Sequence, residues 1–206
     1  MKRSAIALSA ALFLVVTGPL ALSAQRTQKP VLHGKHWVAI TGKPMAATAG
    51  AMMYQKGGNA VDAAAAMLGA TATMWDVLSW GGETQALIYH PGEQRVIGIN
   101  ALGVAPAGAT PEYFRDKDQD FPPSSGVDAM VTPGTPGGLM TMVAEWGRLS
   151  LADVLAPALE MAEGYPMEAD AVRRIRGSAE EMKSWPYTAA VFFPDGGDGP
   201  EAGEIL

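Results

Sequence analysis

The 206-residue chain contains no cysteine and only three histidines. The absence of cysteine excludes disulfides, thiol nucleophiles and zinc–thiolate sites, and three histidines give little basis for metal chemistry. Charged residues are few, at 17%, and the net charge is −6. Because no basic field is available to offset phosphate, the composition argues against a nucleic-acid partner. No apolar run reaches the roughly 20 residues of a membrane-spanning helix, so no integral membrane span is expected.

Hydrophobic residues make up 48% of the chain, which is too much for a disordered protein and enough for a domain core. A basic start, Lys2–Arg3, precedes the apolar stretch Ala5–Val16, a Gly-Pro break and small residues, which is the layout of a secretory signal. A buried N-terminal helix is the alternative, but such helices rarely follow a basic start and end in Gly-Pro. We therefore expect a signal peptide over residues 1–24, a mature chain over 25–206, and export to the periplasm or the extracellular space.

Periodicity and capping residues predict helices, a β-hairpin and loops. The helices are expected at residues 46–56, 63–73, 139–146, 151–163 and 169–183, and the strands at 84–90, 95–100 and, as a short candidate, 130–132. Asn59 is expected to cap the second helix, with Asp62 in its first turn. Both hairpin strands are apolar at nearly every position, which predicts burial on both faces. Residues 116–125 and the chain from Trp185 onward are expected to be loops, and the order of elements fits an α+β layered fold.

Three glycine-rich segments are candidate binding turns. Gly57–Asp62 and Pro133–Gly138 each precede a helix, where backbone amides can hold an anion. Neither carries the lysine or the spacing of a phosphate-binding loop, so a helix–turn–helix junction and a packing turn are favoured. The glycines of Trp80–Thr84 would let the backbone approach another chain segment or a ligand. Glu83 in that segment is a candidate general acid or base, but it has no partner carboxylate in the sequence pattern.

No catalytic or metal-binding constellation is evident from the residues. The histidines His33, His36 and His90 have no metal-ligand spacing, and surface or structural roles are favoured for them. The serine motifs of hydrolases and of β-lactamases are absent. No catalytic residue, no metal ligand and no secure substrate-binding residue is therefore assigned.

An ordered set of motifs resembles the gamma-glutamyltransferase (gamma-glutamyltranspeptidase) family. The matching segments, in chain order, are Pro44–Gly50, Gly57–Ala66, Ser79–Gly82, Ala105–Thr110, Val131–Gly134, Gly137–Leu139, Gly147–Leu149 and Pro157–Ala162 with Gly164. Each match is modest alone, but their common order is very improbable by chance. The resemblance covers residues 35 to 206.

The resemblance implies a four-layer αββα fold of the N-terminal-nucleophile hydrolases, incomplete in this chain. It also implies a precursor that cuts itself into a large and a small subunit, with residues 25–206 forming part of the large one. The nucleophile would be the first threonine of the small subunit, beyond Leu206, with its own amino group as base. The enzyme would move an acyl group, typically gamma-glutamyl from glutathione, to water or an amine, without metal or organic cofactor.

One position departs from the family pattern. Leu102 stands where the resemblance places an arginine that grips the substrate's α-carboxylate. A leucine cannot form the bidentate, charge-assisted contact of a guanidinium, so an acylase of the same family with a non-glutamyl substrate is an alternative. Arg95 and Arg115 are candidates to replace the missing cation. A further alternative is a non-catalytic relative or remnant that serves as a binding or structural domain.

Overall fold

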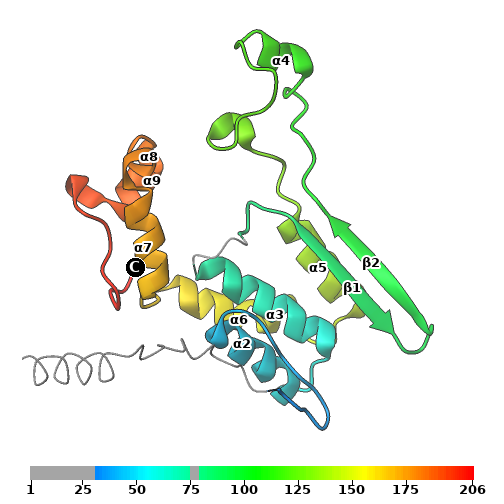
Figure 1. The fold of residues 1–206 in the computed structure, drawn as a ribbon. Helices are drawn as coiled ribbons and strands as arrows, with labels where there is room; N and C mark the ends of the chain where they lie inside the picture. Colours follow the sequence, from blue (N-terminus) through cyan, green and yellow to red (C-terminus); the bar gives the residue numbers. More distant parts are fainter. Residues whose placement is uncertain (1–30, 75–78) are drawn as a thin grey trace, which may run out of the picture. The chain divides into compact units, whose positions relative to one another are not determined.

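The computed structural model of the protein describes residues 31–74 and 79–206 (Figure 1). The signal peptide expected over residues 1–24 lies outside these ranges. By its internal contacts the chain divides into two units, Met1–Lys35 and His36–Leu206. The described part of the first unit, residues 31–35, is exposed and contains no helix or strand. Among the described residues, no helix is both long and apolar enough to cross a bilayer.

A capped helix pair begins the second unit. It consists of α2 (Pro44–Gln55) and α3 (Ala60–Thr73), both slightly longer at the start than predicted. Gly57 between them has a φ of +85°, a left-handed conformation that favours glycine. The Asn59 side chain accepts hydrogen bonds from two backbone N–H groups of α3, at 2.8 and 3.2 Å. Asp62 in turn accepts from the Asn59 N–H at 2.7 Å. This capping box confirms the predicted helix–turn–helix junction.

The main core surrounds α3. This helix packs against α2 and α6 (Leu151–Ala162) and also contacts α5 (Thr135–Trp146) (Figure 1). Within α3 only Ala60 is exposed, which confirms the predicted buried helix. Its small side chains permit close helix packing. The buried hydrophobic residues of this core are Ala46, Ala49, Met53, Ala63, Ala65, Ala66, Ala70, Met74, Leu139, Val143 and Val154.

The predicted hairpin is present, but its predicted burial on both faces is wrong for the described chain. Strands β1 (Thr84–His90) and β2 (Arg95–Ala101) pair antiparallel, and Figure 1 shows α5 beside them. Burial alternates along both strands, and the exposed face carries Leu87, Tyr89 and Val96, which are 81%, 63% and 58% exposed. Within the ranges 31–74 and 79–206, these two strands form a sheet of their own, and the described residues leave one of its faces uncovered.

The later part of the chain is more helical than predicted. The expected helix over 169–183 is divided at Ser178 into α7 (Ala169–Gly177) and α8 (Ala179–Lys183), because Ser178 leaves helical geometry after a glycine that disfavours it. The expected loop after Trp185 contains α9 (Pro186–Phe192) and the short turn η2 (Pro194–Gly196). Two further elements were not predicted, α4 (Pro111–Arg115) and η1 (Val127–Ala129). A second buried cluster joins α7 and α8 to Phe193.

The last described residues pair with the turn after α6. Pro166 and Ile205 form an antiparallel bridge, the Met167 N–H donates to Glu204 O at 2.8 Å, and the Gly203 N–H donates to Met167 O at 2.9 Å. Beside this bridge, Lys43 donates to Glu168 Oε2 at 2.5 Å. These contacts hold three parts of the chain together: the segment before α2, the α6–α7 connection and the residues up to Leu206.

Candidate functional site

Two of the glycine-rich segments meet at the start of α5. The Gly82 carbonyl accepts hydrogen bonds from the N–H groups of Gly134 and Thr135, at 3.1 and 3.2 Å. The hydroxyls of Thr84 and Thr135 lie 3.0 Å apart, and Thr135 is fully buried. The backbone of Trp80–Thr84 therefore does approach another segment, through the Gly82 carbonyl. A Cβ on Gly81 or Gly82 would meet only Ser79, so this contact does not depend on the missing glycine side chains. The partner segment is the start of α5.

The same region receives the end of β2. A Cβ on Gly134 would lie 2.1 Å from the carbonyl oxygen of Ala101, and one on Gly138 would lie 2.4 Å from the Ala101 Cβ. Pro133–Gly138 therefore has the packing role that its sequence favoured. The segment is not a turn before the helix, however, because α5 already begins at Thr135 rather than at Leu139.

Beyond β2 the chain continues beside the segment that was a short strand candidate. The Thr132 N–H donates to Val104 O at 2.8 Å, and a Cβ on Gly103 would lie 2.3 Å from the Thr132 carbonyl oxygen. Residues 130–132 are not a strand, since this single bond does not continue into a ladder. The close approach nonetheless fixes the backbone of residues 102–104.

Leu102 therefore stands at a rigidly held, partly open position. Its N–H donates to Asn100 Oδ1 at 3.2 Å, and the residue is 40% exposed. A hollow of about 430 Å³ lies between the end of β2 and the first turns of α5. Its lining residues are Gly98, Ile99, Asn100, Ala101, Pro133, Gly134, Gly137, Gly138 and Thr141. None of these residues is charged, so the hollow offers backbone, amide, hydroxyl and apolar contacts.

The two arginines considered as replacements for the missing cation are engaged elsewhere. Arg95 pairs with His90 at the hairpin turn, and Leu102 follows the other end of β2, about 20 Å away along the strand. Arg95 also donates to Glu93 Oε2 at 2.5 Å, and this hydrogen bond holds the pKa of the Glu93 carboxyl below its usual value. Arg115 donates to Glu112 Oε1 at 3.3 Å within α4.

The remaining candidates do not assemble a catalytic group. Glu83 is exposed, His33 and His36 are exposed in the segment before α2, and His90 Nδ1 accepts the Glu93 N–H at 3.1 Å in the hairpin turn. Across residues 31–74 and 79–206, no three histidine or carboxylate side chains come together as metal ligands. The described residues at the end of β2 therefore line one side of a candidate binding site, but they do not form a complete catalytic centre.

A polar cluster that the sequence did not reveal lies in the chain segment that connects β2 to α5, at α4 and η1. Lys117 donates to Asp128 Oδ2 at 2.7 Å and to the Tyr113 hydroxyl at 2.6 Å, and Tyr113 donates to Asp128 Oδ1 at 2.8 Å. The hydrogen bond from Lys117 lowers the pKa of Asp128, and the same bond raises the pKa of Lys117. The cluster fastens α4 to η1. Of these three residues only Lys117 lies within residues 116–125, which the sequence predicted to be a loop.

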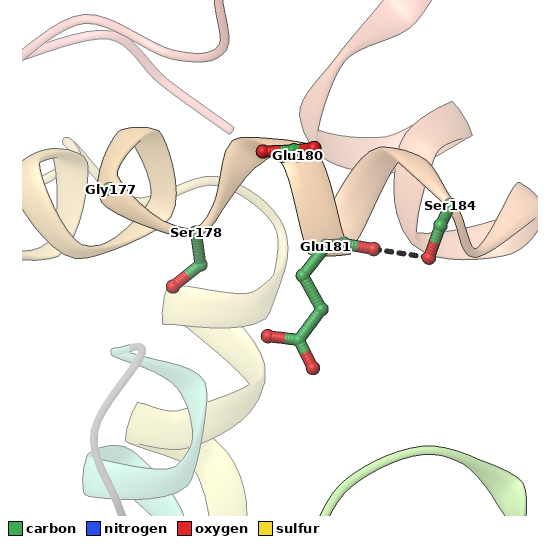
Figure 2. A pocket seen from close by; sticks show the side chains of 5 residues that line it. All are labelled: Gly177, Ser178, Glu180, Glu181 and Ser184. Carbon is green, nitrogen blue, oxygen red and sulfur yellow. Dashed lines mark hydrogen bonds between the residues drawn. The ribbon is translucent and has the colours of Figure 1, made fainter.

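A second polar hollow, of about 530 Å³, lies along α8 and contains two neighbouring carboxylates (Figure 2). Figure 2 shows the Glu181 side chain pointing to the same side as Ser178, whereas Glu180 turns away from it. Ser184 Oγ donates to the backbone carbonyl of Glu181 at 2.6 Å. Because the two carboxylates do not converge, this hollow lacks the paired acid–base geometry of a hydrolytic centre.

Comparison with known proteins identifies the family to which the segments at the end of β2 belong. Residues 46–206 match the family model described as gamma-glutamyltranspeptidase. The chain belongs to this family. Two of the stretches that carried the resemblance in sequence, Ser79–Gly82 and Val131–Leu139, meet at the start of α5 beside the end of β2.

Individual members support the assignment. The chain is 32% identical to the glutathione hydrolase proenzyme of Bacillus subtilis over 201 residues, covering 89% of this chain and 33% of that protein. It superposes on Helicobacter pylori gamma-glutamyltranspeptidase with a TM-score of 0.78 and 26% identity, covering 86% of this chain and 52% of that one. It superposes on a cephalosporin acylase from Bacillus halodurans with a TM-score of 0.73 and 30% identity, covering 88% and 36% respectively.

These likenesses establish the fold. The α+β structure is part of the N-terminal-nucleophile hydrolase fold of gamma-glutamyltranspeptidases, as the resemblance implied. The chain spans about a third of the length of the curated relatives that it matches. The described elements are accordingly one part of the layered architecture, with the hairpin contributing two of its strands.

Proposed function

We propose that the full-length protein is an exported enzyme that transfers or hydrolyses an acyl group, with a nucleophilic threonine contributed by a segment outside these 206 residues. The observation that carries this proposal is the hollow at the end of β2, which is lined by residues of the family's segments Val131–Gly134 and Gly137–Leu139. A further family segment, Ser79–Gly82, contacts this region because the Gly82 carbonyl accepts hydrogen bonds from the N–H groups of Gly134 and Thr135. The described residues supply contacts there but no nucleophile–base pair. An N-terminal threonine with its own amino group as base would supply the missing chemistry.

The partner in this proposal is a small subunit cut from the same precursor. Relatives of this chain are named proenzymes. The exposed face of the hairpin, with Leu87, Tyr89 and Val96, is an apolar surface of the kind that another layer of a fold covers. We assign the mature chain from residue 25 to part of the large subunit and the export to residues 1–24.

Two classes of acyl substrate are compatible with the family, gamma-glutamyl amides and less polar acyl amides, and Leu102 favours the second class. A gamma-glutamyl group, typically that of glutathione, carries an α-carboxylate that would require a cation at the site. The hollow has no charged lining residue, and both candidate arginines bind other carboxylates. An acylase acting on a less polar acyl amide is therefore the second candidate, and a solved relative is named a cephalosporin acylase.

The test uses the complete reading frame, expressed with its own signal sequence. Export would remove residues 1–24, and self-cleavage would yield two polypeptides, the second with an N-terminal threonine by mass spectrometry. The processed protein is then assayed on gamma-glutamyl p-nitroanilide and on the neutral pentanoyl p-nitroanilide. Faster release from the pentanoyl substrate identifies an acylase, and faster release from the gamma-glutamyl substrate identifies a glutathione-type enzyme. A folded protein that is neither cleaved nor active would overturn the proposal in favour of a binding or structural domain.

A further inference from the structure

A separate hollow of about 590 Å³ lies between α2 and the second half of α6. Its walls are two helical stripes, Met45, Thr48, Ala49 and Met52 on α2 and Pro157, Glu160 and Met161 on α6, and Gly164–Pro166 also line it. The spacing of each stripe places its members on one helix face. The volume lies within the range of small-molecule sites, about 300 to 1,000 Å³.

The lining is mostly apolar, and the hydroxyl groups of its two polar uncharged side chains already donate hydrogen bonds within the protein. The Thr48 hydroxyl donates to Pro44 O at 3.2 Å, and the Tyr165 hydroxyl donates to Glu168 Oε1 at 3.2 Å. Burial raises the pKa of the Tyr165 phenol, so this group stays neutral at physiological pH. Methionine side chains adapt to varied apolar shapes, which suits them to line a binding site.

The charge of the hollow is negative. Glu160 is its single ionisable carboxylate among the lining residues, and the carbonyl end of α6 lies beside it. A helix C-terminus favours a cation. No lysine or arginine lines the hollow, and Lys43, directly before α2, is bound to Glu168.

We propose that this hollow binds a small organic amine, with its apolar body against the methionines and its ammonium group against Glu160 and the end of α6. The hollow lies on other elements than those at the end of β2. Its occupation is therefore independent of the reaction proposed there.

The test uses full-length processed protein and ligand-observed NMR titration with three probes of one shape. These are 4-phenylbutylamine, 4-phenylbutanol and 4-phenylbutanoate, which differ only in the charge of the head group. Because Glu160 is exposed, we expect the amine to bind about two- to five-fold more tightly than the alcohol, and the carboxylate to bind weakest. Equal binding of the amine and the alcohol, or no binding of the amine, would overturn the proposal.

Two variants locate the site. Glu160→Gln keeps the size of the side chain and should lower the amine affinity to that of the alcohol. Thr48→Leu fills the hollow from α2 and should weaken both probes. Glu145→Gln, at an exposed carboxylate on α5 that does not line the hollow, is the matched control and should bind the amine as the unmodified protein does. An amine affinity unchanged by both Glu160→Gln and Thr48→Leu would place the ligand elsewhere and refute the assignment. Anilide release is measured in parallel, so that failure of the catalytic proposal is seen separately.

Discussion

The carboxylate of Asp62, at the start of α3, accepts hydrogen bonds from the backbone N–H groups of Arg148 and Leu149, which follow it by 86 and 87 positions. Asp62 is fully buried, and its carboxylate also accepts from the Asn59 N–H. The Asn59 side chain in turn donates to the Trp146 carbonyl at 2.6 Å. One capping box therefore also binds the turn between α5 and α6 and fixes how these helices meet α3.

We expect Asp62→Asn to destabilise the protein by about 2–3 kcal/mol, because an amide nitrogen would face backbone donors that then lose their acceptor. The measurement is chemical unfolding of the full-length protein. Asp120→Asn, at an exposed loop position, is the control and should change the free energy of unfolding little. Equal stability of the two variants would show that the buried carboxylate does not hold the turn.

The contact between α5 and β2 can be tested with neighbouring glycines. Gly134→Ala would place a methyl group 2.1 Å from the Ala101 carbonyl oxygen, so we expect a loss of about 2 kcal/mol or more. Gly137→Ala is the matched control, because a Cβ there meets nothing within 4 Å and alanine favours the helix. Differential scanning calorimetry of the full-length protein should show a lower Tm for the first variant and an equal or higher one for the second. A tolerated Gly134→Ala would contradict the close approach.

Acyl specificity should depend on position 102. If the proposed function is correct, Leu102→Arg should raise kcat/KM for the gamma-glutamyl anilide relative to the pentanoyl anilide by about ten-fold or more, through a charge-assisted contact with the α-carboxylate. Val104→Arg adds the same charge at an exposed position two residues further on. A shift of similar size in both variants would indicate general electrostatic attraction rather than a specific contact.

The cap of α6 should depend on pH. Ser150 donates to Asp153 Oδ2 at 2.6 Å, and this hydrogen bond is the main cause that lowers the pKa of Asp153, with a smaller contribution from the charge of Lys56. A lowered folded-state pKa stabilises the protein above the unfolded value, and this stabilisation is lost as pH falls through the folded value. We expect Ser150→Ala to raise the Asp153 pKa in a carboxyl NMR titration, whereas Ser150→Thr should preserve it. An identical pKa in all three proteins would contradict this cause.

The isolated 206-residue chain should behave as an incomplete fold. The hairpin exposes Leu87, Tyr89 and Val96 on one face. We expect strong binding of the dye ANS and no cooperative melt, with the double variant Leu87→Ser and Val96→Thr binding less dye. Gln85→Ser, on the same exposed face but polar, is the control. A sharp, cooperative melt of the unmodified chain would instead favour an independent domain.

The sequence was most informative where local chemistry decides the structure. The Asn59 cap, the glycine-rich junction before it and the hairpin each depend on a few adjacent residues, and all were predicted. The break at Ser178 was missed because the amphipathic period continues across it. The prediction that both faces of the hairpin are buried was wrong for the described chain. The prediction rested on apolar composition alone, and the described residues cover one face of the hairpin only.

The candidate site was only partly visible in the sequence. Its glycines and Leu102 were singled out, but their convergence required contacts between segments about 50 positions apart, such as Thr84 with Thr135. The engagement of Arg95 and Arg115 with nearby glutamates was not predicted, although both pairs are close in sequence. Glycine spacing indicates that a backbone approaches something, but it does not indicate which segment it approaches.

Because Gly138 lies close to Ala101, the side chain that either position can carry depends on the residue at the other. A methyl group at 138 would collide with the methyl group that residue 101 already carries. The space between the helix and the strand is therefore one methyl group wide and can be filled from either side, but not from both. Among homologous sequences, an alanine at 138 should accompany a glycine at 101, whereas glycine at 134 should not vary with residue 101, because its neighbour is a backbone oxygen that every residue has.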